Sequence, residues 1–234
     1  EEINRVVTDA LADMLWTPSP DGDENLVREG VPEEKIQRVG NIMIDSLEML
    51  RSRVEKERAY ERWGLRPGEY GLVTLHRPAN VDWVEVLKKI VSGLCEAAER
   101  LPLIFPVHPR TRKALEQGGL MSQLQESAGL LITDPLGYIP FMNLVFNSRL
   151  VITDSGGIQE ETTYLGIPCL TLRPNTERPV TITQGTNRLC TPADFRERFL
   201  AAVEVGRKEI PSIEFWDGQT AGRVVGSIRE FLAK

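Results

Sequence analysis

The sequence predicts an α/β fold built on a doubly wound parallel sheet, with helices on both faces of the sheet. From residue 71 onward, short uninterrupted apolar runs alternate with longer helical stretches. Uninterrupted apolar strands are typical of parallel sheets covered on both faces, and parallel strands need crossover connections that are usually helices. The chain has 234 residues, 41% of them hydrophobic, so it can bury a substantial core without disulfide or metal cross-links.

The first 70 residues follow a less regular pattern of short elements. In order, the apolar spacing predicts a helix over 1–14, a strand over 15–17, a helix over 23–29, a strand over 36–39 and a charged helical stretch over 42–62. Pro18 would stop the first strand, and Gly30 would end the second helix as a C-cap glycine. We interpret residues 1–40 as a small segment with few partners of its own, and 41–70 as a connector helix with a solvated face.

The regular region that follows predicts a complete parallel sheet. We expect strands over 71–75, 103–107, 130–133, 150–153, 168–172 and 187–190, and helices over 81–100, 111–117, 140–147, 156–165 and 192–207. After the loop at Pro211, a last helix is expected over 218–233. All strands of such a sheet end at one edge, where ligands bind in the crevice outside the carboxyl ends.

Composition and charge exclude several classes of function. The net charge of −6 argues against a nucleic-acid backbone as the main ligand, because proteins that bind it usually carry an excess of Lys and Arg. No apolar run reaches the roughly 18 residues that span a bilayer, and no signal-peptide pattern is present, so a cytoplasmic location is expected. The three cysteines, Cys95, Cys169 and Cys190, are widely spaced in apolar contexts, which indicates buried reduced thiols and no metal site.

The stretch 150–161 has the outline of an anion-binding site. A buried strand leads through Ser155, Gly156 and Gly157 into the first turn of a helix. The start of a helix has backbone N–H groups without partners and a partial positive charge, so a phosphate can bind there. Ser155 could cap the helix or donate its hydroxyl to an oxygen, and Glu161 could reach the hydroxyls of a ribose. The same string is also an ordinary strand-to-helix turn, and by itself it does not decide between the two interpretations.

Cationic and titratable residues follow several of the predicted strands. The two histidines of the chain, His76 and His108, each come directly after a strand, at the edge that also carries Ser155. The same edge carries further charged residues: Arg77, Arg110, Arg173, Glu177 and Arg178. Their convergence favours an anion with more than one charge, such as a diphosphate. A histidine at a strand end is also often a turn residue bonded to a carbonyl, and the Arg110 region could be a solvated helix face.

These residues belong to a set of motifs that runs along the whole chain. The motifs are Glu1 to Arg5, Gly40 to Asp45, His76-Arg77-Pro78-Ala79-Asn80, Pro106-Val107-His108-Pro109, Thr153 to Glu161, Thr176-Glu177-Arg178-Pro179 and Asp217-Gly218-Gln219. The pairing of Thr-Asp-Ser-Gly-Gly-Ile-Gln-Glu-Glu with a downstream Thr-Glu-Arg-Pro is far more specific than a glycine motif alone. With these motifs the chain resembles the non-hydrolysing UDP-N-acetylglucosamine 2-epimerases, in their C-terminal portion.

The resemblance implies a GT-B fold, in which two Rossmann-like domains hold the substrate in the cleft between them and the C-terminal domain binds the nucleotide. It also implies an isomerase that converts UDP-N-acetylglucosamine into UDP-N-acetylmannosamine. The C2 proton is removed as UDP leaves, and UDP is then added back with the proton delivered on the other face. No cofactor or metal is implied. A homodimer and a role in polysaccharide biosynthesis are expected from the same likeness.

The resemblance also assigns roles to individual residues. It implies that Ser155, Gly156 and Gly157 hold the phosphates, Glu161 the ribose and the Phe141 region the uracil, with Arg178 also at the UDP site. His76 would lie at the leaving diphosphate and stabilise its charge as a cation. Glu1 matches a catalytic carboxylate of the family. Arg77 and His108 would belong to a neighbouring site for a second, activating UDP-sugar.

One departure from the family pattern is large. A Gly-Thr-Arg-Pro-Glu turn and nearby acidic residues of the family's N-terminal domain have no counterpart in this sequence. We therefore expect residues 1–40 to be a remnant of that domain, 71–215 to be the nucleotide-binding domain, and 216–234 to pack back on the N-terminal domain. This chain alone is then expected to bind UDP weakly without epimerising.

Three alternatives to the non-hydrolysing epimerase remain open at this stage. A GT-B glycosyltransferase would use the same helix start and ribose glutamate for its donor. A hydrolysing epimerase would release free sugar and UDP. If the chain were complete, a non-catalytic UDP-sugar-binding module would be the better interpretation.

Overall fold

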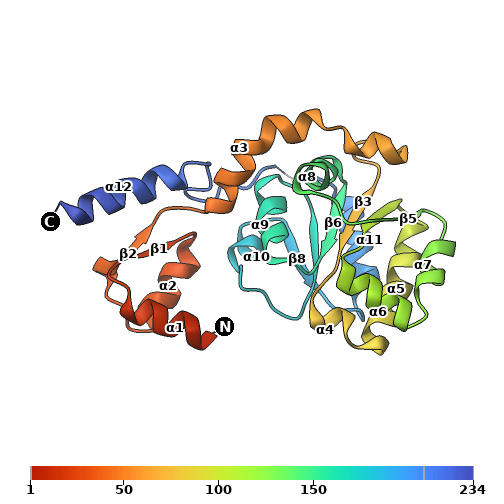
Figure 1. Ribbon diagram of the computed structural model, residues 1–234, viewed down its shortest axis with the longest axis horizontal. Coiled ribbons are helices and arrows are strands. Elements are labelled where there is room, and N and C mark those ends of the chain that lie inside the picture. The colour runs from red at the N-terminus through yellow and green to blue at the C-terminus, as the bar shows by residue number, and fades with distance from the viewer. Residues whose placement is uncertain (1, 208, 234) are drawn as a thin grey trace. The chain divides into compact units, whose positions relative to one another are not determined.

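The computed structural model describes residues 2–207 and 209–233, and the chain divides into two compact units (Figure 1). One unit combines Glu1–Met49 with Ser212–Lys234, and the other is the continuous stretch Leu50–Pro211. The continuous unit contains the large sheet, and it also contains most of the predicted site residues.

The large sheet has six parallel strands in the order β5-β4-β3-β6-β7-β8. The strands are β3 (Gly71–Thr74), β4 (Leu103–Pro106), β5 (Leu130–Thr133), β6 (Leu150–Thr153), β7 (Cys169–Leu172) and β8 (Asn187–Cys190). The chain builds outward from β3 to β5, then returns to the other side of β3 and builds outward again. This order is that of Rossmann-type sheets, and it confirms the predicted fold class. The order reverses between β3 and β6.

Helices cover both faces of this sheet (Figure 1). One face is covered by α5 (Val84–Ala98), α6 (Pro109–Gln117), α7 (Met121–Glu126) and α11 (Phe195–Val205), which enclose the main apolar cluster. The other face is covered by α8 (Tyr138–Asn147), α9 (Gly156–Tyr164) and α10 (Val180–Thr183). Every residue of β4, β6 and β7 is buried because of this double cover, which explains their uninterrupted apolar sequences.

The connector predicted as one helical stretch over 42–62 consists of two elements. The helix α3 (Ile42–Lys56) ends before Arg58, whose φ of 47° is left-handed, and the short 3₁₀ helix η2 (Ala59–Trp63) follows. The fully buried Asn143 stabilises the break, because its side chain donates to the carbonyl of Val54 (2.8 Å) and accepts from the amide of Ala59 (2.7 Å). The prediction of one helix was wrong because a residue 84 positions away supplies the partners that the interrupted backbone needs.

Other differences from the predicted elements are small. The helix expected over 81–100 is divided into α4 (Pro78–Val81) and α5, with Trp83 extended at the start of α5. The helices α7 and α10 were not predicted, since four to six residues are too few to show a helical period. None of these differences alters the sheet or the edge at which its strands end.

The unit that combines Glu1–Met49 with Ser212–Lys234 is built around a short parallel pair of strands. Its elements are α1 (Glu2–Leu11), β1 (Leu15–Thr17), α2 (Pro20–Arg28), η1 (Glu33–Lys35), β2 (Ile36–Arg38), the N-terminal part of α3, and α12 (Thr220–Leu232). The indole of Trp16 donates to the hydroxyl of Ser227 (3.0 Å), and Arg223 donates to the carbonyl of Val39 (3.1 Å). The carboxylate of Asp45 accepts from the amide that begins α12, at Thr220 (3.1 Å). The C-terminal helix is therefore held by residues of the first 50.

Three further observations concern the described part of the chain. Cys169 and Cys190 are buried free thiols, while Cys95 is only partly buried, so the expectation of burial was wrong for Cys95. Within residues 2–207 and 209–233, no three His, Cys, Asp or Glu side chains are grouped so as to hold a metal ion. No helix in those residues has both the length and the apolar character needed to cross a membrane.

Candidate functional site

The candidate site lies where the strand order of the large sheet reverses, at the carboxyl ends of β3 and β6. The chain leaves β3 through Leu75, His76 and Arg77, and it leaves β6 through Asp154 and Ser155. A reversal of strand order separates the two flanking loops and opens a crevice between them, which is where ligands bind in sheets of this type.

Asp154 joins these two loops. Its carboxylate is fully buried and accepts hydrogen bonds from the backbone amides of His76 (3.1 Å to each oxygen) and Arg77 (2.9 Å). It also accepts from the side-chain amide of Asn80 (3.1 Å), which donates a second bond to the carbonyl of Leu172 (2.9 Å) at the end of β7. Burial by itself raises the pKa of the Asp154 carboxyl, but the bonds from His76, Arg77 and Asn80 outweigh it and lower the pKa. A buried carboxylate thus links three strand ends.

The two histidines lie close together beside this carboxylate. Nδ1 of His76 is 3.0 Å from Oδ1 of Asp154, and the ring centroids of His76 and His108 are 5.8 Å apart. The side chain of His76 is 38% exposed, so the ring also contacts solvent. Nδ1 of His108 accepts the backbone N–H of Arg110 (3.2 Å) and caps the start of α6. His76 therefore has a carboxylate partner and His108 a backbone partner.

The start of α9 is open to a ligand. Ser155 occupies the N-cap position, but its side chain makes no capping hydrogen bond, so the expected cap is absent and the hydroxyl is free to donate elsewhere. A Cβ placed on Gly156 would meet nothing within 4 Å, so the backbone here faces open space. Gly157 follows as the second helical residue. The first N–H groups of a helix have no partner within it, and at this position they can bind an anion.

Glu161 lies further along α9 and is 2% exposed. Its carboxylate accepts a hydrogen bond from the hydroxyl of Tyr138 (2.9 Å), which begins α8. Burial, followed by repulsion from Glu160, raises the pKa of Glu161 to about 7, although the Tyr138 bond acts in the opposite direction. Phe141 lies one turn beyond Tyr138 on α8 and is partly exposed. On α8 it is thus Tyr138 that donates a hydrogen bond to the carboxylate of Glu161.

The loop after β7 is fastened to α9 by side chains. The hydroxyl of Thr176 donates to Gln159 (2.6 Å), and Arg178 forms an ion pair with the buried Glu160 (Nε to Oε1, 2.8 Å). Glu177 forms a bidentate ion pair with Arg173 (2.5 and 2.7 Å), and the hydrogen bonds from Arg173 lower the pKa of Glu177 to about 2. Arg178 is thus engaged with α9 through Glu160.

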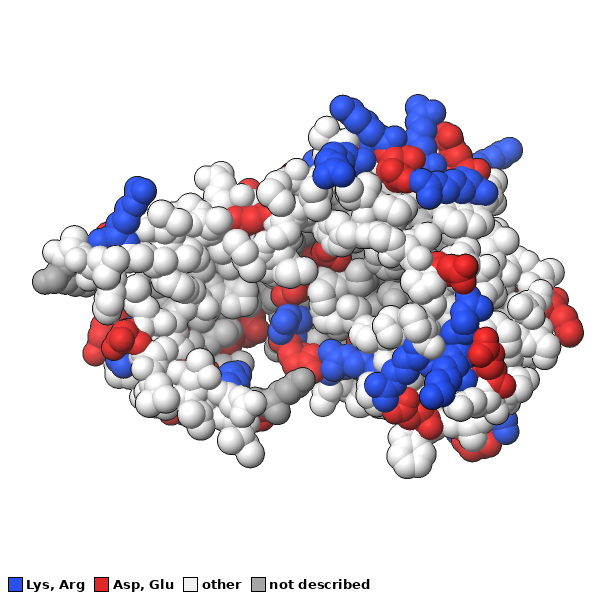
Figure 2. Space-filling view, in the orientation of Figure 1, with Lys and Arg blue, Asp and Glu red and all other residues white. Residues whose placement is uncertain are grey.

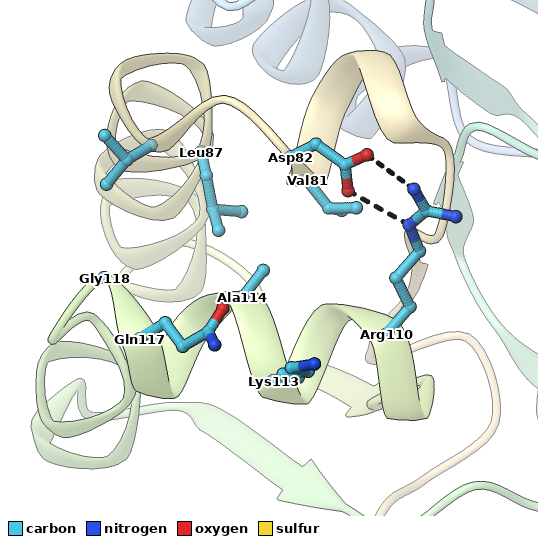
Figure 3. Close-up of a pocket in the computed structure, with 9 residues that line it drawn as sticks. Val81, Asp82, Leu87, Arg110, Lys113, Ala114, Gln117 and Gly118 are labelled. Carbon is cyan, nitrogen blue, oxygen red and sulfur yellow. Dashed lines mark hydrogen bonds and ion pairs between the residues drawn. The ribbon is translucent and has the colours of Figure 1, made fainter.

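A separate groove lies in the same unit, between the α4–α5 turn and α6 (Figure 3). It has a volume of about 590 Å³, and the ion pair between Asp82 and Arg110 (2.5 Å) borders it. None of the residues that the sequence analysis assigned to UDP binding lines this groove. Figure 2 shows acidic side chains beside basic ones over this region and over the C-terminal part of α3, in agreement with pairs such as Arg51–Glu55.

Sequence reasoning named several residues of this site and missed others. The structure brings His76, Arg77, His108 and Ser155 to one edge of the sheet, as their positions after strands indicated. Glu1 lies outside the described residues. The sequence assigned no role to three residues of this site: Asp154, Asn80 and Tyr138. An acidic residue directly after a buried strand was a signal for Asp154, but nothing local showed that its partners lie 77 and 78 residues earlier.

Comparison with known proteins identifies the family of this chain. The family model for UDP-N-acetylglucosamine 2-epimerase matches residues 1–229. The chain belongs to the UDP-N-acetylglucosamine 2-epimerase family. The curated UDP-N-acetylglucosamine 2-epimerase of Methanocaldococcus jannaschii is 41% identical over 232 residues, which make up 96% of this chain and 63% of that protein. The UDP-2,3-diacetamido-2,3-dideoxy-D-glucuronate 2-epimerase of Pseudomonas aeruginosa is 37% identical over 100% of this chain and 63% of its own length.

Solved structures of epimerases share the fold. The crystal structure of the Methanocaldococcus jannaschii UDP-GlcNAc 2-epimerase in complex with UDP-GlcNAc and UDP matches with a TM-score of 0.86 and 39% identity, covering 98% of this chain and 64% of that one. The family match confirms the GT-B-type α/β fold predicted from the sequence. This epimerase-family chain thus spans somewhat less than two thirds of the relatives it matches.

Proposed function

We propose that this chain binds UDP at the start of α9. The diphosphate would be held by the backbone N–H groups of Gly156 and Gly157 and by the hydroxyl of Ser155, with the positive end of the helix supplying further attraction. The carboxylate of Glu161 would accept a hydrogen bond from a ribose hydroxyl. Arg178 and the Phe141 region would complete the site on the diphosphate and uracil sides.

The observation that carries this proposal is the open helix start at the strand-order reversal. The free hydroxyl of Ser155 and the open space over Gly156 coincide with the place where sheets of this type bind nucleotides. Two structural relatives, the UDP-GlcNAc 2-epimerases from Methanocaldococcus jannaschii and Neisseria meningitidis, have crystal structures with UDP-GlcNAc bound.

For the whole protein we propose the inversion of C2 in UDP-N-acetylglucosamine, giving UDP-N-acetylmannosamine. A base takes the C2 proton while the C1–O bond breaks, and its electron pair leaves with UDP. The resulting unsaturated sugar then receives UDP at C1 and a proton at C2 on the opposite face. His76 would lie at the diphosphate and stabilise the negative charge that develops on it. Glu1 remains the proposed carboxylate from this chain.

Further properties are proposed from the family likeness alone. They include a homodimer, a cytoplasmic location and a part in polysaccharide biosynthesis. A second UDP-sugar would bind as an activator beside Arg77 and His108. The ring of His108 lies next to that of His76. The 2-epimerase from Pseudomonas aeruginosa acts, by its name, on a differently substituted UDP-sugar.

The binding proposal is tested by titrating UDP into the purified chain and by solving its structure with UDP. We expect one UDP per chain, with the diphosphate against residues 155–157. A ligand lodged in the groove beside Asp82 and Arg110, with residues 155–157 empty, would overturn the assignment.

The reaction is tested with the whole protein in heavy water, with UDP-N-acetylglucosamine as the only substrate. Epimerisation incorporates deuterium at C2 and retains the nucleotide on the sugar. Transfer chemistry leaves C2 without deuterium, and a hydrolysing enzyme releases free sugar. Either of these two results would contradict the proposed reaction.

A further inference from the structure

Asp154 has more donors around it than an ordinary turn residue needs. A carboxylate placed only to cap the loop after β3 would require the amides of His76 and Arg77. Here the side chain of Asn80 and the imidazole of His76 are also within hydrogen-bond distance of the same fully buried group. The carboxylate therefore holds both the backbone and the ring of one residue.

The contact to the ring determines which nitrogen of His76 is available to a ligand. Nδ1 faces Oδ1 of Asp154 at 3.0 Å, and an ionised carboxylate can only accept a hydrogen bond. Nδ1 must then carry a proton, which leaves Nε2 as the nitrogen that can meet a ligand. Because the bonds around Asp154 lower its pKa, the carboxylate remains ionised near neutral pH and can retain this proton.

We propose that Asp154 is a positioning residue that holds Nδ1 of His76, so that Nε2, when it is protonated, donates to the diphosphate bound at α9. The identity of that ligand rests on the proposed function. Asp154 immediately precedes Ser155, so the same turn that presents the phosphate-binding hydroxyl also orients the histidine. One buried carboxylate thereby aligns groups from β3 and β6 on a single ligand.

The amide variant Asp154→Asn tests this role because it cannot accept with both of its polar atoms. If its oxygen faces His76, its NH₂ group opposes the donors of Arg77 and Asn80, and if it is flipped, the NH₂ group opposes Nδ1 of His76. We therefore expect the variant to disturb His76 while the remaining sheet stays intact. A matched control is Asp82→Asn, which also removes one carboxylate but faces the guanidinium of Arg110.

The decisive measurement is imidazole ¹⁵N NMR of the chain, which contains only two histidines. In the native chain at a pH where both rings are neutral, we expect the proton on Nδ1 in His76. In His108 we expect it on Nε2, because Nδ1 accepts from Arg110. A His76 ring protonated on Nε2 would overturn the proposal without any variant, so the test does not depend on whether Asp154→Asn folds. In Asp154→Asn the His76 pattern should change and the His108 pattern should not.

Kinetics of the whole enzyme supply the second readout. Asp154→Asn should lower kcat by at least about 10-fold, because a misplaced donor loses part of the roughly 100-fold or more that one charge-stabilising group contributes. KM should change less than about 3-fold, and Asp82→Asn should leave both values unchanged. An unaltered kcat in Asp154→Asn would contradict the positioning role. If the native enzyme does not epimerise, the proposed reaction fails, whereas the NMR result still decides the link between Asp154 and His76.

Discussion

Two helices begin at the same edge of the large sheet, and their first residues differ. The start of α6 is closed, because Nδ1 of His108 accepts the N–H of Arg110 and Pro109 removes another N–H donor. The start of α9 is open, because Ser155 makes no side-chain cap and Gly156 faces empty space. The same fold thus satisfies one helix start internally and leaves the other for a ligand.

The two helices also differ in burial. In α6, Thr111 and Leu115 are the buried residues, so its charged side chains face water. In α9 every residue from Ile158 to Thr163 is buried, and two of these are glutamates. A buried charged residue is costly unless it has partners or a ligand, and Tyr138 and Arg178 supply such partners. The helix at the strand-order reversal therefore combines an open start with buried polar side chains, whereas α6 has a capped start and exposed charges.

The largest expected effect concerns the buried carboxylate of α9. The pKa of Glu161 is about 7 in the folded chain and near 4.5 when exposed, so the folded state holds an extra proton between these values. The contribution of this group to the free energy of unfolding is therefore fully present below about pH 4.5, and it is lost as the pH rises through about 7. Relative to native, Glu161→Gln should gain of order 3 kcal/mol between pH 4.5 and pH 8. Denaturant unfolding at both pH values measures this, with Glu116→Gln on α6 as the control. Identical pH dependence in native and Glu161→Gln would refute it.

A side chain at Gly156 should close the open helix start. Gly156→Val adds atoms where nothing lies within 4 Å, so the fold should tolerate it, but the added methyl groups occupy the space proposed for a phosphate. We expect UDP affinity to fall about 30-fold, roughly 2 kcal/mol, with little change in Tm. Calorimetric titration of UDP checks this, and Gly222→Val, which also meets open space, is the matched control. Unchanged affinity in Gly156→Val would place the ligand elsewhere.

Removing the free hydroxyl should affect binding and spare stability. Ser155→Ala is expected to weaken UDP binding by about 1 to 2 kcal/mol, the usual loss for a hydrogen bond to a charged group. Its unfolding free energy should hardly change, since the side chain makes no cap, whereas loss of a working cap costs about 1 kcal/mol. Parallel UDP titration and urea unfolding separate the two effects. A variant that is destabilised but binds normally would indicate a structural cap.

The smallest expected effect is at the start of α6, where removing the cap should lower stability and spare UDP binding. His108→Ala removes the acceptor for the N–H of Arg110 and should lower the unfolding free energy by about 0.5 to 1 kcal/mol. UDP affinity at α9 should stay within about 2-fold of native. His108→Asn keeps an acceptor at the N-cap and should retain most of the stability. A large loss of UDP affinity in His108→Ala would remove the distinction between the two helix starts.

Much of the fold could be predicted from local sequence because the relevant forces act locally. Uninterrupted apolar strands between helices indicate a parallel sheet, and all six predicted strands are present in the structure. The break between α3 and η2 was missed because its hydrogen-bond partners come from Asn143 on a distant helix. Short helices such as α10 were missed because four residues show no period.

The sequence by itself determined the fold class, the family and the placement of His76, His108 and Ser155 after strands. Each of these follows from the order of residues along the chain, since a strand end is a local event and parallel strands end at a common edge. Only the tertiary structure decided that Asp154 holds the His76 ring, that Tyr138 meets Glu161, and that α9 is open where α6 is closed. The contacts of Tyr138 with Glu161 and of Asp154 with His76 join residues 23 and 78 positions apart, and hydrogen bonds depend on distances and angles that only packing determines.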